Sequence, residues 1–150
     1  MKNRLLALAI AAVSIALPAF SQAQSAAPQA AQPAKHKVVF ELNAPAPSGW
    51  DQLFNNVKNV QKIFEKDGVQ VEIVFFGKGL PMLLKTNSEY AARLKEAHDA
   101  GVMLGACQNT MRAMKIKSED LFPFATEVDS GVAELVRKQE EGFKYIKGGE

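Results

Sequence analysis

Cys107 is the only cysteine in the 150-residue chain, and it lies in residues 102–110, where an apolar strand is expected to end and a short helix to begin. A thiol at a helix N-terminus faces unpaired backbone amides and the positive end of the helix dipole, which both favour the thiolate. The thiolate is the nucleophilic form of cysteine. Free cysteine is also among the most buried residue types. The sequence therefore leaves two roles open for Cys107, a reactive thiol and a small structural side chain.

The start of the chain has the pattern of a cleavable export signal. Lys2 and Arg4 give a short positive start, residues 5–17 are uncharged and apolar, and a proline ends that stretch. The apolar stretch is too short to span a bilayer comfortably, and Ser21-Gln22-Ala23 supplies the small residues that a signal peptidase recognises. We therefore predict a signal peptide over residues 1–23, a periplasmic or secreted protein, and no membrane attachment after cleavage.

An exported protein exposes its thiols to oxidising conditions. Cys107 has no partner cysteine in its own chain, so it must be buried, joined to another molecule, or used in chemistry. This reasoning places Cys107 at the centre of the functional question.

The composition after the signal indicates a short tether followed by one small domain. Residues 24–36 are rich in Ala, Gln and Pro and are expected to be disordered, and residues 37–150 are expected to form the domain. Removal of Lys2 and Arg4 with the signal leaves 16 basic and 16 acidic residues, which are interspersed along the chain. This balance argues against nucleic-acid binding.

The hydrophobic periodicity predicts alternating strands and helices. Strands are expected over residues 37–43, 69–76, 102–106, 122–128 and 143–146. The first helix is expected to begin at Ser48, with Asp51 as the capping-box partner of Ser48. Further helices are expected over residues 81–84, from Asn87 or Ser88 onward, directly after Cys107, and over residues 132–139. This order predicts a single α/β domain, a five-stranded and mainly parallel sheet with helices on both faces.

Parallel sheets bind ligands at the carboxyl ends of their strands, where the strand order reverses. In a flavodoxin-like order, 2-1-3-4-5, this point lies between the first and third strands. It would bring Asn43, Ser48 and Trp50 close to Cys107 and to the two residues after it, Gln108 and Asn109. We take these five neighbours as candidate binding residues and Cys107 as the candidate sulfur acceptor.

The stretch Gly101-Val102-Met103-Leu104-Gly105-Ala106-Cys107-Gln108-Asn109-Thr110-Met111 resembles the cysteine region of the DsrE/DsrF-like family, small α/β proteins of sulfur relay and sulfur oxidation. Residues 128–135 and 139–145 resemble exported members of that family, and the similarity extends over about residues 37–147. Gln108 stands where a glycine is common, and the characterised relays are cytoplasmic. The resemblance implies that Cys107 accepts sulfane sulfur as a persulfide, with sulfur donor and acceptor proteins or small sulfur species as partners. It implies a sulfur carrier rather than a stand-alone enzyme, with no cofactor.

Two other functions remain open at this point. Cys107, Met111 and Met114 are spaced at i, i+4 and i+7, with Met103 on the preceding strand, and soft sulfur ligands of this kind select Cu(I). Methionine at that spacing is more often core filler, so no metal site is expected. The third possibility is a non-catalytic binding module in which Cys107 is structural.

A homo-oligomer is expected, a trimer or a hexamer by the family resemblance. Residues 80–84 and 121–124 are more apolar than a small core easily covers, and exposed apolar surface of that extent usually marks an interface.

Overall fold

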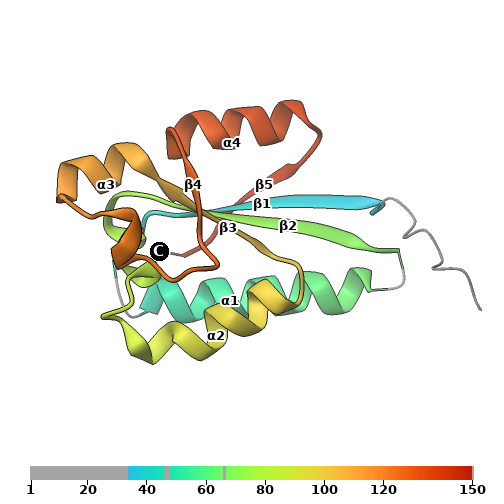
Figure 1. The fold of residues 1–150 in the computed structure, drawn as a ribbon. Helices are drawn as coiled ribbons and strands as arrows, with labels where there is room; N and C mark the ends of the chain where they lie inside the picture. Colours follow the sequence, from blue (N-terminus) through green and yellow to red (C-terminus); the bar gives the residue numbers. More distant parts are fainter. Residues whose placement is uncertain (1–33, 46–47, 66, 150) are drawn as a thin grey trace, which may run out of the picture. The chain divides into compact units, whose positions relative to one another are not determined.

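Five parallel strands form one sheet in the part of the chain that the structure describes (Figure 1). The structure is a computed structural model and describes residues 34–45, 48–65 and 67–149. The predicted signal peptide and most of the predicted tether lie outside these residues. The strands are β1 (His36–Leu42), β2 (Val69–Phe75), β3 (Met103–Cys107), β4 (Thr126–Val128) and β5 (Lys144–Lys147), and they lie in the order β4-β3-β2-β1-β5.

Helices cover both faces of this sheet (Figure 1). On one face lie α1 (Ser48–Phe64) and α2 (Ser88–Asp99), and on the other lies α4 (Gly131–Glu140). A 3₁₀ helix, η1 (Gly77–Leu83), and α3 (Gln108–Met114) follow the carboxyl ends of β2 and β3, and a single 3₁₀ turn, η2 (Ser118–Asp120), precedes β4. Crossovers between parallel strands are right-handed. The chain moves across the sheet in one direction from β1 to β3, which places α1 and α2 on one face. It moves in the opposite direction from β4 to β5, which places α4 on the other face. The predicted fold class is confirmed.

The two faces bury two separate apolar clusters. The larger cluster lies under α1, α2 and η1 and contains Phe40, Leu53 and Leu104. The smaller one lies under α4 and is built from Val39, Val74, Leu135 and Phe143. Side chains alternate along each strand, so neighbouring residues of a strand contribute to different clusters. Cys107 and Gly105 therefore face α4, while Ala106 between them faces the larger cluster.

The strand order differs from the flavodoxin-like one. β2 pairs with both β1 and β3, so β1 and β3 are not neighbours. The strand order instead reverses between β1 and β5. The expectation that a switch point would bring β1 and Cys107 together was therefore wrong. Hydrophobic periodicity identifies strands but carries no information about which strands pair.

The fourth strand is shorter than expected. Residues 122–125 are not part of the sheet, because Pro123 has no amide to donate and the amide of Phe122 donates to the carbonyl of Leu83 at 2.9 Å. The helix after β2 begins at Gly77 rather than at Pro81. A Cβ at Gly79 would lie 2.2 Å from the carbonyl oxygen of Leu42, so only glycine permits this close crossing of β1.

The two apolar segments that were expected to form an interface are largely internal. Leu80, Met82, Leu83 and Leu121 are buried in the larger cluster, and the prediction that these segments supply an exposed interface was wrong. The helices in the described part of the chain are all too short or too polar to cross a membrane.

Candidate functional site

Cys107 is the last residue of β3 and the N-cap residue of α3. Its side chain is 4% exposed and points toward the N-terminus of α4, where the amide of Gly131 donates a hydrogen bond to Sγ at 3.1 Å. The thiol thus lies at the carboxyl edge of the sheet, at the start of one helix and facing the start of another. A cysteine that served only as apolar filler has no need of a directed amide donor.

Thr110 is a second residue that acts on the charge of the same sulfur atom. The hydroxyl of Thr110 favours the thiolate of Cys107, which lies three residues earlier in the chain, and lowers its pKa. The amide of Gly77 donates to Thr110 Oγ1 at 3.0 Å, so one lone pair of this oxygen is occupied and the hydroxyl proton is available for the sulfur. The loop after β2 is therefore hydrogen-bonded to the residue whose hydroxyl favours the thiolate.

Burial and hydrogen bonding act on the pKa of the thiol in opposite directions. Burial alone would raise the pKa of Cys107, but hydrogen bonds from the Thr110 hydroxyl and from the amides of Gly131, Thr110 and Asn109 favour the thiolate. Their sum outweighs burial, and the pKa of Cys107 lies below the ordinary value for a cysteine. The site stabilises negative charge on sulfur in a largely water-excluded position.

Close packing fixes the position of the Gly131 amide. A Cβ at Gly131 would lie 3.0 Å from atoms of the Phe76 side chain, so a larger residue would displace the helix start. Ser130 caps α4 by accepting a hydrogen bond from the amide of Ala133. Arg137 forms an ion pair with Asp129 at 2.5 Å, which ties the loop before α4 to the helix itself. The loop, the cap and Phe76 together hold the amide against the sulfur.

A buried carboxyl group lies on the same face of the sheet as the thiol. Glu72 on β2 is 3% exposed, and its Oε1 lies 3.2 Å from the position that a Cβ on Gly105 would occupy. Lys138 Nζ on α4 forms an ion pair with Glu72 Oε2 at 3.3 Å, but this oxygen has no hydrogen-bond partner among the described residues. Burial raises the pKa of Glu72, and the nearby Lys138 only partly opposes that effect.

Asn43 lies near the site, although the strand that it follows is not a neighbour of β3. It follows β1, two strands away from β3, and its Oδ1 lies 2.1 Å from the position that a Cβ on Gly77 would occupy. Gly77 has a φ of 50° and donates to Thr110, so Asn43 lies beside the hydrogen bond between Gly77 and Thr110. Its own side chain is exposed.

Gln108 and Asn109 follow Cys107 in the first turn of α3. The side chain of Gln108 donates to Glu127 on β4 at 2.9 Å, and the side chain of Asn109 accepts from Arg112. The side chains of both residues are therefore engaged with neighbours other than the thiol. The contribution of Asn109 to Cys107 comes from its backbone amide.

Trp50 and Ser48 lie at the start of α1, on the opposite face of the sheet. Trp50 is buried in the larger cluster, donates to the carbonyl of Ala44 at 2.9 Å and packs edge-on against Tyr90. Ser48 is the first residue of α1, and its side chain lies outside the described part. Asp51, expected as its capping partner, forms an ion pair with Arg93 of α2. The structure does not bring Trp50 to the thiol.

Sequence reasoning missed Thr110, Gly131 and Gly77. Thr110 follows Cys107 by three residues, the spacing of one helical turn, which was a usable local signal. Gly131 follows it by 24 residues, and its amide carries no side-chain signature. Its place after Ser130 at a helix start was the only indication of a free donor.

The placement of the methionines does not support the copper alternative. Met111 is buried in the larger cluster, Met103 packs against the smaller cluster on the other face, and Met114 is 43% exposed. Across the described residues, no three His, Cys, Asp or Glu side chains cluster in a way that could hold a metal ion.

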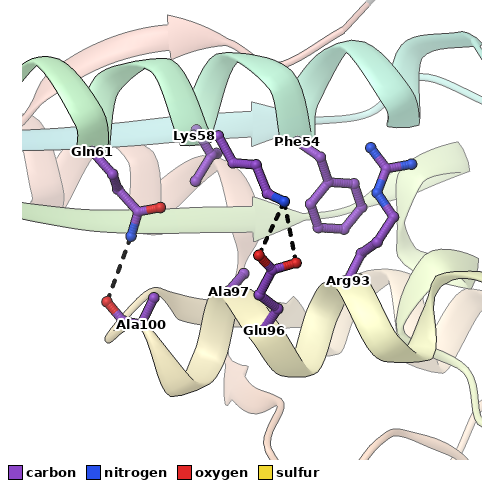
Figure 2. A pocket seen from close by; sticks show the side chains of 8 residues that line it. Phe54, Lys58, Gln61, Arg93, Glu96, Ala97 and Ala100 are labelled. Atoms are coloured by element: carbon purple, nitrogen blue, oxygen red, sulfur yellow. Dashed lines mark hydrogen bonds and ion pairs between the residues drawn. The ribbon is translucent and has the colours of Figure 1, made fainter.

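A hollow lies between α1 and α2, away from the thiol (Figure 2). It has a volume of about 160 Å³ and is lined by Phe54, Lys58, Gln61, Arg93 and Glu96, among others. Figure 2 shows Lys58 paired with Glu96, at 3.0 Å, and Gln61 directed at the carbonyl of Ala100. Arg93 lies over the ring of Phe54 and pairs with Asp51. These charges neutralise one another, which fits a contact between two helices better than a ligand site.

Comparison with known proteins agrees with this architecture. The model of the DsrE/DsrF-like family matches residues 12–147, and the chain belongs to that family. Proteins of this family function in sulfur relay and are often oligomeric. A solved structure, the protein of unknown function MTH1491 from Methanobacterium thermoautotrophicum, is similar with 31% identity and a TM-score of 0.65, over 75% of this chain and 98% of that one. No curated protein matches the chain.

Proposed function

We propose that this protein carries sulfane sulfur on Cys107 as a persulfide. The observation that carries the proposal is the hydrogen bond from the Gly131 amide to Sγ at 3.1 Å, which together with the Thr110 hydroxyl lowers the pKa of a thiol that is almost fully buried. Membership of a family of sulfur-relay proteins supports the same role. Donors that stabilise a thiolate also stabilise the terminal charge of a persulfide, because both are sulfur anions.

The transfer requires no external oxidant or reductant. The Cys107 thiolate attacks the outer sulfur of a donor persulfide, R–S–S⁻, and a new sulfur–sulfur bond forms as the donor's own bond breaks. The products are Cys107–S–S⁻ and the donor thiolate, R–S⁻. Delivery to an acceptor thiolate is the same exchange in reverse, so the protein returns to its starting state.

The absence of a second cysteine from the sequence suits a carrier. A neighbouring thiol would attack the persulfide, form an intramolecular disulfide with the carrier cysteine and release the outer sulfur. With one cysteine, the sulfur leaves only through an external acceptor. We infer a carrier that works between a donor and an acceptor, each a protein or a small sulfur species.

Persulfide loading of the native protein tests the proposal. The protein is treated with a small polysulfide and its mass is measured without reduction. The expected result is a gain of sulfur on the native protein and no gain on Cys107→Ser, which should unfold at nearly the same temperature because oxygen can accept the same hydrogen bonds. Alkylation by a small reagent should show a thiol that titrates below the free value of about 8.5.

If Cys107 is only a structural residue, the same experiment should have a different outcome. Its supporting observation is the 4% exposure of Cys107. A thiol that gains no sulfur and reacts with the alkylating reagent only after unfolding would assign Cys107 to the core and exclude the carrier role.

We further propose that the protein is exported and works in the periplasm or outside the cell. The proposal rests on the signal pattern of residues 1–23. Protein recovered from the periplasm is expected to begin near Gln24 by intact mass. Retention of Met1 to Ala23 on a cytoplasmic protein would reverse this assignment.

A further inference from the structure

A buried carboxyl group that the proposed sulfur exchange does not use lies beneath α4, on the same face of the sheet as Cys107. Glu72 of β2 is 3% exposed, and its Oε2 has no hydrogen-bond partner among the described residues. Folded proteins supply partners for almost all buried polar atoms, and an unpaired carboxylate oxygen is costly away from water. Glu72 is therefore a buried group that is stabilised by taking up a proton.

Gly105 allows this carboxyl group to lie close to the thiol. Glu72 Oε1 lies 3.2 Å from the position that a Cβ on Gly105 would occupy, so the carboxyl group covers the glycine. Cys107 follows Gly105 by two residues on the same face of β3, a step of roughly 7 Å along a strand. The carboxyl group and the sulfur atom are therefore on the order of 10 Å apart, in the layer between α4 and the sheet.

The ammonium group that compensates the charge of Glu72 is shared. Lys138 Nζ lies 3.3 Å from the carboxylate of Glu72. It also lies 3.6 Å from Glu134 and 3.3 Å from Glu141. Arg137 pairs with Glu134 at 2.7 Å. Lys138 therefore offsets only part of the charge of Glu72.

Other charged side chains near the two groups have partners of their own or are exposed. On β1, Lys37 and Glu41 alternate with residues of the larger cluster and so share the face of Glu72. Lys37 donates to a backbone carbonyl, and Glu41 accepts a hydrogen bond from the hydroxyl of Tyr145 at 2.6 Å. The charged side chains of the segments that surround the thiol are exposed, and they are Lys78, Arg112 and Asp129. Solvent screens these exposed charges, whereas it screens Glu72 and Cys107 much less.

We infer that Glu72 and Cys107 are coupled through their charges, so that a proton on Glu72 favours the sulfur anion and the loss of this proton disfavours it. This role of Glu72 rests on the proposed function, in which Cys107 is an anion both as a thiolate and as a persulfide. Glu72 acts on the sulfur through its charge and does not touch it. As the pH falls and Glu72 takes up its proton, the repulsion disappears, and the sulfur anion persists to a lower pH. Glu72 thereby sets the pH range in which the protein holds sulfur.

The rate of alkylation of Cys107 against pH tests this coupling. Glu72→Gln keeps the shape of the side chain and removes its charge. The midpoint of the profile should fall by about one pH unit, the effect of one charge at this separation for an effective dielectric constant of about 20. The plateau rate at high pH should stay the same. Glu141→Gln is the matched control, because Glu141 pairs with the same ammonium group but lies after the far end of α4, and it should leave the midpoint unchanged.

Two results of this experiment would overturn the inference. The first is a midpoint of Glu72→Gln equal to that of the native protein. The second is a changed plateau rate without a changed midpoint, which would show that Glu72 only holds α4 in place.

The coupling can also be measured from the side of Glu72, because a coupling between two sites is reciprocal. In protein labelled with carbon-13 at the glutamate carboxyl groups, the resonance of Glu72 should show a second step at the pH where Cys107 ionises. Cys107→Ser should lack that step. A native protein without the step would contradict the coupling, whatever the behaviour of the glutamine variant.

Persulfide loading separates this inference from the carrier role. A native protein that gains sulfur, but whose midpoint equals that of Glu72→Gln, retains the carrier role and loses the coupling. Shifted midpoints in a protein that gains no sulfur support the coupling and remove the carrier role.

Discussion

At the scale of single residues, the chemistry depends on how many donors reach one sulfur atom. Cys107 was identified from the sequence because cysteine is rare in this chain and because of its place after an apolar strand. The groups that tune it are a threonine hydroxyl and backbone amides, and an amide belongs to every residue type except proline. The sequence therefore singles out the thiol but carries little information about the groups that surround it. Asn43 illustrates the same limit, since its place beside Gly77 depends on the fold.

Thr110 offers the sharpest test at this scale. Thr110→Val keeps the shape of the side chain and removes the hydroxyl, so the thiolate loses a charge-assisted hydrogen bond and the pKa of Cys107 should rise. Alkylation of the native protein at pH 7 is expected to slow roughly tenfold, the effect of one hydrogen bond to a charged group. Thr110→Ser retains a hydroxyl and should restore most of the rate. Equal rates in all three proteins, over the full pH profile, would show that the hydroxyl does not act on the sulfur.

At the scale of elements, α4 links the thiol to a buried ion pair. Its first residue donates to Cys107, and in its last turn Lys138 lies near Glu72 of β2 and near Glu134 and Glu141. Periodicity predicted this helix and most strand positions to within a few residues. It failed over residues 122–125, where an apolar run around Pro123 bonds to η1 instead of extending the sheet. Apolar runs are compatible with either outcome, and only tertiary contacts decide between them.

The buried carboxyl group gives a prediction with a definite sign. Because burial raises the pKa of Glu72 above its ordinary value of 4.5, the folded protein holds this proton more tightly than the unfolded chain does. Unfolding then releases a proton, and the free energy of unfolding falls as the pH rises from about 4.5 through the raised pKa. Glu72→Gln should therefore be more stable than the native protein at pH 7, and the difference should shrink toward pH 4.

Urea unfolding at several pH values measures this difference. Glu141→Gln is the matched control, because Glu141 also pairs with Lys138 but has a side chain that is 53% exposed. It should change stability little at any pH, as exposed ion pairs contribute about 0–1 kcal/mol. A stability gain of Glu72→Gln that grows as the pH falls would contradict the assignment of Glu72 as a destabilising buried charge.

At the scale of the whole molecule, the question is how copies of the chain assemble. The segments expected to form the interface are mostly buried, but α4 presents two other apolar side chains outward. Val132 is 61% exposed and Val136 is 49% exposed, and they are neighbours on one side of the helix that begins at the thiol. Members of the family are often oligomeric. We propose that this face of α4 meets a second copy, which would place each Cys107 near a subunit boundary.

The expected state of the mature protein is a homo-oligomer, a trimer in the simplest case, by light scattering at micromolar concentration. Val136→Lys places a charge in the proposed contact and should weaken association at least tenfold, because an unpaired charge is costly when a contact excludes water. Ile63→Lys is the matched control, since Ile63 is an apolar residue of α1 that is 74% exposed on the opposite layer. It should leave the mass unchanged. A native protein that is monomeric, or two variants with equal effect, would show that α4 does not form the interface and that the thiol serves its partners from a single chain.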